Sequence, residues 1–189
     1  MRTTLSVAGR PRSFTVIGDP DGPQERALVL VFHGSKQNGE AHRRFTGRAL
    51  DELAADGQAV VVYLDGYRGN WNDARAESSF PARKVQVDDV AFVRAVIDSV
   101  NESHGFDKNA VVGVGYSNGG QMVFRVVHEA PELLGGAVVV AATMPDRAGF
   151  LSGFSEVAAR PLPIVLVAVT GSSRLRGAAW RGGRARCSR

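Results

Sequence analysis

Cysteine is almost absent from this chain. Of its 189 residues only Cys187 is a cysteine, and it lies near the end of the sequence, so the body of the chain cannot contain a disulfide bond. No uninterrupted apolar run approaches the roughly 20 residues that a membrane-spanning helix needs. The first residues also lack the apolar region of a signal peptide. The sequence therefore predicts a cytoplasmic protein that does not enter a membrane.

A general excess of positive charge is also lacking. The formal net charge is +4, but residues 171–189 contain six arginines and no acid. Without that segment, 17 basic residues face 19 acidic ones, a net charge of −2. We therefore expect no nucleic-acid-binding surface on the folded part, and we predict that residues 171–189 form a disordered basic tail.

Apolar strands alternate with helical segments along the rest of the chain. Strands are predicted at 27–32, 59–64, 110–114, 135–143 and 163–170, and helices at 40–55, 87–100 and 121–129. Continuous apolar strands separated by helices are typical of an α/β fold, a mostly parallel sheet with helices on both faces. Residues 1–170 are accordingly predicted to form a single core domain.

Three further segments complete this organisation. Residues 5–8 and 13–17 predict an opening β-hairpin, joined across residues 9–12. The connection 65–84 has no clear periodicity, and its length of about 20 residues favours a functional loop. Residues 144–162 predict a short helix with connections.

The most informative motif joins a predicted strand to a predicted helix. It reads Gly115-Tyr116-Ser117-Asn118-Gly119, and its glycines lie two residues before and two after the serine. This arrangement is a nucleophile elbow, in which a tight turn presents a serine hydroxyl at a helix N-terminus. Ser117 is therefore the predicted catalytic nucleophile. The alternative is a strand-to-helix turn that does no chemistry.

Backbone donors for an oxyanion are predicted beside Ser117. His33-Gly34-Ser35 directly follows the first core strand, where hydrolases of this architecture supply one donor, and the residue after the nucleophile supplies the other. We assign the donors to the backbone N–H groups of Ser35 and Asn118. His33, Trp71 and Tyr116 are the candidates for a substrate pocket, with loop or core packing as the alternative.

A general base is missing from the expected place. In this architecture the acid and the histidine follow the nucleophile, yet the only later histidine is His128, and no Asp or Glu follows Glu156. Eleven helical residues separate His128 from Ser117, about 16 Å at ~1.5 Å per residue. Asp65 is a weaker candidate for a displaced acid, and Asp88 and Asp89 fit a helix start. We expect no metal and no organic cofactor.

Several of these segments together resemble one esterase family. The chain is similar to the α/β-hydrolase esterases related to polyhydroxybutyrate depolymerases, feruloyl esterases and acetylxylan esterases. The matching segments follow the family order: 33–37, 63–66, 71–73, 87–90, 115–120 and 143–145. The resemblance implies hydrolysis of small-molecule or polymeric esters through an acyl-enzyme, without a cofactor, by a Ser-His-Asp triad in proteins that are mostly secreted. Where relatives often have a disulfide-bonded cysteine, this chain has Ser35.

The resemblance ends after the last predicted strand. There the family continues with an acid-bearing turn and later a histidine, whereas this chain reads Thr170-Gly171-Ser172-Ser173-Arg174. Written in GC-rich codons and read one frame over, residues 169–174 become Asp-Arg-Val-Val-Pro. We therefore predict an α/β-hydrolase core that lacks its last strand and helix, with the sequence from about residue 168 onward read out of frame. A natural basic tail is the alternative.

Three interpretations of function follow. The first is a serine esterase crippled by the loss of its triad Asp and His. The second is another α/β-hydrolase chemistry, such as that of a peptidase or thioesterase, because the elbow and the donors would be the same. The third is a non-catalytic remnant that keeps the pocket. The sequence gives no indication of the oligomeric state.

Overall fold

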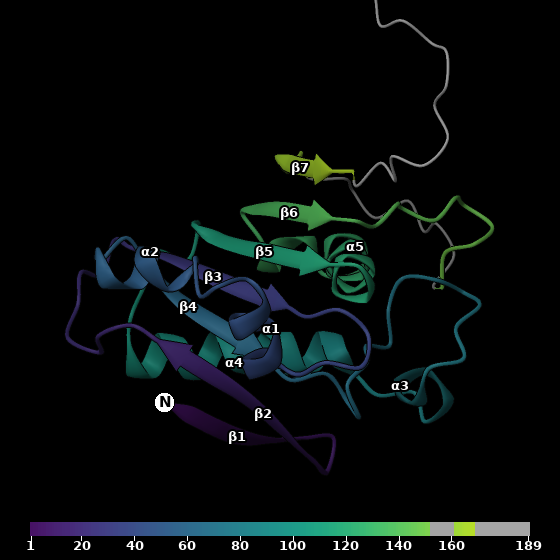
Figure 1. Ribbon diagram of the computed structural model, residues 1–189, viewed down its shortest axis with the longest axis horizontal. Coiled ribbons are helices and arrows are strands. Elements are labelled where there is room, and N and C mark those ends of the chain that lie inside the picture. The colour runs from purple at the N-terminus through teal and green to yellow at the C-terminus, as the bar shows by residue number, and fades with distance from the viewer. Residues whose placement is uncertain (152–160, 169–189) are drawn as a thin grey trace, which may run out of the picture.

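A seven-stranded sheet organises the molecule, with the strand order β1-β2-β4-β3-β5-β6-β7. The computed structural model describes residues 1–151 and 161–168. Its strands are β1 Arg2–Val7, β2 Arg10–Ile17, β3 Ala27–Phe32, β4 Ala59–Leu64, β5 Val111–Tyr116, β6 Gly136–Val140 and β7 Ile164–Val167. Strands β3 to β7 run parallel, and β2 pairs antiparallel with β4 (Figure 1). The predicted mostly parallel α/β fold is confirmed.

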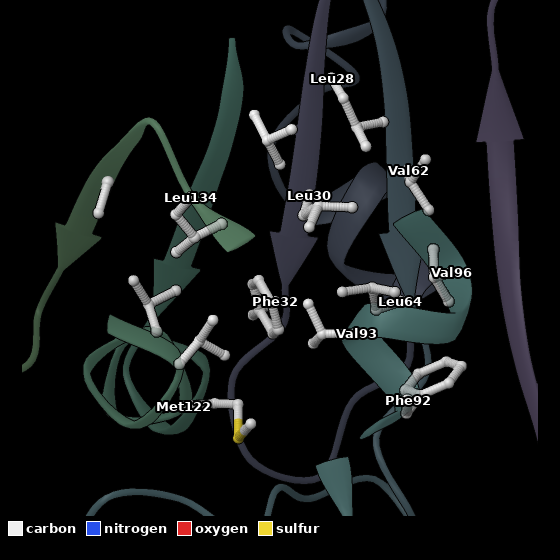
Figure 2. Packing of buried hydrophobic residues seen from close by; sticks show 14 of the residues in the cluster. Leu28, Leu30, Phe32, Val62, Leu64, Phe92, Val93, Val96, Met122 and Leu134 are labelled. Atoms are coloured by element: carbon white, nitrogen blue, oxygen red, sulfur yellow. The ribbon is translucent and has the colours of Figure 1, made fainter. Parts of the chain in front are cut away.

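Helices cover both faces of this sheet, as predicted. They are α1 Gly39–Phe45, α2 Asp51–Ala55, α3 Pro81–Lys84, α4 Asp89–Ser103, α5 Asn118–Glu129 and a 3₁₀ turn at Pro131–Leu133. On one face, alternate residues of β3 and β4 pack against α4 and α5; Figure 2 shows Leu30 and Leu64 facing Val93. On the other face, Val29 and Val61 pack against residues of α2. The alternation of side chains along a strand produces these two apolar layers.

The opening hairpin is tighter than predicted. Only Ala8 and Gly9 separate β1 from β2, with φ of 48° and 73°. Two successive residues at positive φ are the signature of the two-residue turn that matches the twist of paired strands. The four-residue connection predicted from the sequence is therefore wrong, because Arg10 and Arg12 already pair with β1.

The single helix predicted at 40–55 is two helices. The Thr46 hydroxyl donates to the carbonyls of His42 and Arg43, which ends α1. Gly47 and Arg48 then adopt φ of 63° and 60°, outside the helical region. Local hydrogen bonding by threonine and a left-handed glycine thus overrides the apolar periodicity.

Two other predictions have a different outcome. The loop 65–84 contains one short helix, α3, in its last residues. Of the segment 144–162, residues 152–160 lie outside the described part, and residues 144–151 form turns without a helix. The predicted tail 171–189 also lies outside the described residues.

Among the helices of residues 1–151 and 161–168, none is both long and apolar enough to cross a membrane.

Candidate active site

Ser117 occupies the turn between β5 and α5 with a strained backbone. Its φ and ψ are 52° and −115°, a combination that costs a non-glycine residue of order 1–3 kcal/mol. The turn is held by hydrogen bonds on both sides: the Ser117 N–H donates to the carbonyl of Val140 at 2.9 Å, and its carbonyl accepts from the N–H of Gln121 at 3.1 Å. Strand β6 and helix α5 therefore both hold the serine in place.

The glycines around Ser117 are required by close backbone contacts. A Cβ atom at Gly115 would lie 2.5 Å from the carbonyl oxygen of Gly119, and one at Gly119 would lie 2.0 Å from that of Phe32. Both distances are far shorter than any real Cβ contact. The elbow pattern seen in the sequence thus reflects the space available between β3, β5 and α5.

A cavity of about 390 Å³ opens beside the serine. It is lined by Ser35, Arg75, Phe80, Ser117, Asn118, Gln121, Ala141, Ala142, Thr143 and Ala168. The structure thus brings the predicted nucleophile and both predicted donor residues to one cavity, at the carboxyl ends of the parallel strands. This edge is where open α/β sheets bind ligands.

The two predicted donor groups carry no hydrogen bond to any described residue. Among the described residues, neither the backbone N–H of Ser35 nor that of Asn118 donates to a protein acceptor. Asn118 is the first residue of α5, where backbone N–H groups lack intrahelical partners and the helix dipole favours negative charge. An oxyanion at this point would find unpaired donors.

The side chain of Asn118 connects the elbow to the long loop. Its Oδ1 accepts from the backbone N–H of Trp71 at 2.9 Å, and its Nδ2 donates to the carboxylate of Asp73. Asp73 is completely buried and also receives the guanidinium of Arg75. The sequence analysis assigned no role to Asp73 or Arg75. The signals were the place of Asp73 in the matching segment 71–73 and the position of Arg75 in the loop just after it.

His33 and Trp71 do not line the cavity. Both are completely buried, and their rings lie 5.0 Å apart. The Trp71 indole N–H donates to the His33 carbonyl, and His33 Nε2 accepts from the Gly66 N–H at 2.9 Å. Burial lowers the pKa of His33, which favours the neutral ring. The expectation that these two side chains form a substrate pocket is thereby corrected: they fasten the loop to the end of β3.

Tyr116 also lies away from the cavity. Its ring packs 5.8 Å from that of His42 and 5.6 Å from that of Phe45, both in α1. Strand alternation turns Tyr116 toward α1 while Ser117 begins the turn to α5. Tyr116 does not line the Ser117 cavity, and its part in a substrate pocket stays a prediction.

The acidic residues considered in the sequence analysis, Asp65, Asp88 and Asp89, have partners away from Ser117. Asp65 accepts from the N–H of Gly39 at the start of α1 and forms an ion pair with Arg2. Asp88 caps α4 through the Ala91 N–H, as predicted. Asp89 is completely buried and forms an ion pair of 2.6 Å with Arg12, so it does more than begin a helix.

A general base for Ser117 is absent from the described residues. All four histidines fall within that part of the chain, and none lines the cavity. His128 packs its ring 4.4 Å from that of Phe150. The Ser117 hydroxyl has no hydrogen-bond partner within residues 1–151 and 161–168. These same residues contain no group of three side chains suited to hold a metal ion.

Comparisons with known proteins agree with this geometry. No family model matches the chain. It is 32% identical over 143 residues to the putative esterase NocK of Nocardia uniformis subsp. tsuyamanensis, an alignment that covers 74% of this chain and 40% of that protein. The chain therefore spans about two fifths of the length of this relative.

Solved structures of esterases share the fold. A thermostable esterase aligns with a TM-score of 0.61 at 15% identity, over 88% of this chain and 45% of that one. The Bacillus cereus carboxylesterase aligns with a TM-score of 0.53 at 20% identity, over 73% of this chain and 63% of that one. These likenesses and the sheet define the chain as a protein of the α/β-hydrolase fold. Its sequence is similar to that of the putative esterase from Nocardia over 143 residues.

Proposed function

We propose that this chain carries the nucleophile and the oxyanion-binding half of a carboxylic-ester hydrolase, with Ser117 as the nucleophile. The observation that supports it most is the strained Ser117 at a cavity that also contains Ser35 and Asn118, whose backbone N–H groups are unpaired within the described residues. The esterase-like sequence favours ester hydrolysis over peptidase or thioesterase chemistry.

In the proposed reaction, Ser117 Oγ attacks the carbonyl carbon of the ester. The carbonyl oxygen becomes an oxyanion that accepts hydrogen bonds from the N–H groups of Ser35 and Asn118, worth several kcal/mol of barrier reduction. A general base takes the Ser117 proton during the attack. Collapse of the intermediate breaks the carbon–oxygen bond of the ester, and the leaving alkoxide takes up this proton and departs as the alcohol. Water then hydrolyses the acyl-enzyme to release the acid and restore Ser117. The proposed substrates are hydroxyacid, feruloyl or acetyl esters, the kinds of ester implied by the resemblance to the esterase family.

Ser117 must give its hydroxyl proton to a base. In residues 1–168 no Asp or Glu followed by a histidine comes after Ser117, which is the order expected of this architecture. We propose that residues from about 168 onward are read out of frame and that another frame encodes the triad Asp and His. The nucleotide sequence across codons 160–189 and beyond tests this directly. A single-base insertion or deletion near codons 167–169 is expected, and the absence of any frame with an Asp and a later His would contradict the proposal.

A test of Ser117 uses the hydrolysis of p-nitrophenyl acetate. Without a base, residual catalysis of about 10³–10⁴ over water is the expected range for a serine hydrolase with a broken triad. This residual catalysis comes from the oxyanion hole and from binding, so Ser117 is tested in the frame-corrected chain. There Ser117→Ala should lower the activity to the residual level, whereas Ser6→Ala, on the exposed edge of β1, should leave it unchanged. Activity of the frame-corrected chain that stays above this residual level in Ser117→Ala would refute the assignment.

A non-catalytic binding protein is the second candidate. It is favoured by one observation, the Ser117 hydroxyl without a hydrogen-bond partner in the described part of the chain. Such a protein would bind an ester analogue in the cavity yet show no release of p-nitrophenol above that of Ser117→Ala. A frame-corrected chain that hydrolyses esters readily would decide for the enzyme.

A further inference from the structure

Arg75 is the only charged residue among the described residues that line the Ser117 cavity. It belongs to the long loop between β4 and α3, and its side chain is 38% exposed. The other lining residues are small, neutral or, at Phe80, aromatic. A single cation in an otherwise neutral cavity is a strong determinant of which ligands bind there.

The guanidinium of Arg75 is held in place from behind. Its Nε donates to one carboxylate oxygen of Asp73 at 3.0 Å, and its Nη2 donates to the other at 2.6 Å. This is the bidentate geometry in which arginine and carboxylate pair most strongly. Because Asp73 is completely buried and also receives the Asn118 side chain, the arginine is positioned by the same residue that supports the elbow.

The backbone around Arg75 is equally fixed. Arg83 Nη2 donates to the carbonyls of Asp73 and Arg75 at 2.6 and 2.7 Å. The N–H of Ala76 donates to the Gly149 carbonyl, and that of Leu151 donates to the Ala74 carbonyl. The loop is thus paired with the segment before residue 152, and Arg75 has little freedom to leave the cavity wall. Binding by a preorganised group costs less conformational entropy.

One part of the guanidinium remains unused. Within the described residues Nη1 donates to no acceptor, and the Arg75 guanidinium lies 5.4 Å from the centre of the Phe80 ring. Guanidinium N–H groups match the oxygens of a carboxylate. No acidic residue among the described lining residues competes for the N–H groups of Nη1. Building on the function proposed above, we propose that Arg75 selects esters that carry one free carboxylate in addition to the ester group. The hemiesters of short dicarboxylic acids are such esters.

The test measures binding by calorimetry to the full chain with Ser117→Ala, which removes turnover. The ligands are two unreactive anilides of similar shape, N-(4-nitrophenyl)succinamate and the neutral N-(4-nitrophenyl)butyramide. One charge-assisted hydrogen bond is worth about 1.5–3 kcal/mol, so the anion should bind roughly tenfold or more tightly. Added Arg75→Gln should remove this preference while the neutral ligand binds as before. Arg44→Gln, an exposed arginine of α1, is the matched control and should keep the preference.

A second measurement covers the case in which loss of Arg75 unfolds the chain by leaving Asp73 unpaired. In the Ser117→Ala chain with Arg75 intact, the affinity for the succinamate should fall as NaCl is raised, and that for the butyramide should not. Equal affinities at low salt, or a preference that survives Arg75→Gln, would overturn the inference. In the frame-corrected chain, hydrolysis of p-nitrophenyl acetate that depends on Ser117 tests the proposed function separately. Anion-selective binding without that hydrolysis would refute the proposed function and leave the Arg75 site standing.

Discussion

Strands β4 and β7 are both short and apolar, and each has a parallel neighbour, but their surroundings are opposite. All six residues of β4 are at most 2% exposed, whereas the four residues of β7 are 39–64% exposed. Strand β4 pairs on both sides, with β2 and β3, and helices pack over its two faces. Strand β7 pairs with β6 alone among the described residues and lies at the edge of the sheet (Figure 1). An apolar run predicts a strand, but its burial depends on what the rest of the chain places around it.

The largest expected loss comes from breaking the buried ion pair next to β4. Arg12 and Asp89 are 3% and 0% exposed, and Asp89 also accepts from the Asn72 N–H. Asp89→Ala leaves the Arg12 charge buried without its partner, so the free energy of unfolding should fall by about 3–5 kcal/mol. The exposed pair of Arg94 and Glu132 is the control: Glu132→Ala should cost less than about 1 kcal/mol. Urea unfolding followed by circular dichroism measures both. Equal losses would mean that Asp89 is solvated in solution.

A matched pair of leucines compares the two strands directly. Leu64 in β4 is fully buried, and Leu166 in β7 is 64% exposed. Leu64→Ala should lower the free energy of unfolding by about 2–5 kcal/mol, because it removes apolar burial and leaves a cavity. Leu166→Ala should change it by less than about 0.5 kcal/mol.

Self-association through β7 would reduce the difference between the effects of Leu64→Ala and Leu166→Ala on stability. An exposed apolar edge strand favours pairing between copies, so Leu166→Lys should reduce aggregation as measured by light scattering. If Leu166→Ala destabilises as much as Leu64→Ala, and the effect grows with protein concentration, β7 is buried in an assembly. A large effect that does not depend on concentration would instead show that another part of the chain covers β7.

The same contrast explains how much the sequence could predict. The elbow was predictable because its determinants are local: an apolar strand, two glycines and a helix around Ser117. The bond between Asp73 and Asn118 spans 45 positions and depends on how the long loop folds over the sheet, which no periodicity encodes. His33 and Trp71 were placed at the correct edge of the sheet but at the wrong depth. Depth depends on packing from distant segments, as it does for β4 and β7.

Apart from the control variants, the smallest expected loss of stability comes from acid acting on the helix layer beside β4. His42 of α1 is buried against Tyr116, and burial lowers its pKa from 6.5 to about 4. The unfolded chain therefore binds a proton near pH 6.5 that the folded chain does not bind until about pH 4, so stability should fall as the pH is lowered through this window. Between pH 7 and pH 5 the expected loss from this residue is about 2 kcal/mol.

His42→Gln should flatten the dependence of the free energy of unfolding on pH without abolishing it, because burial also lowers the pKa values of His33 and His104. An unchanged slope in His42→Gln would mean that the ring is already protonated, or exposed, in the folded protein.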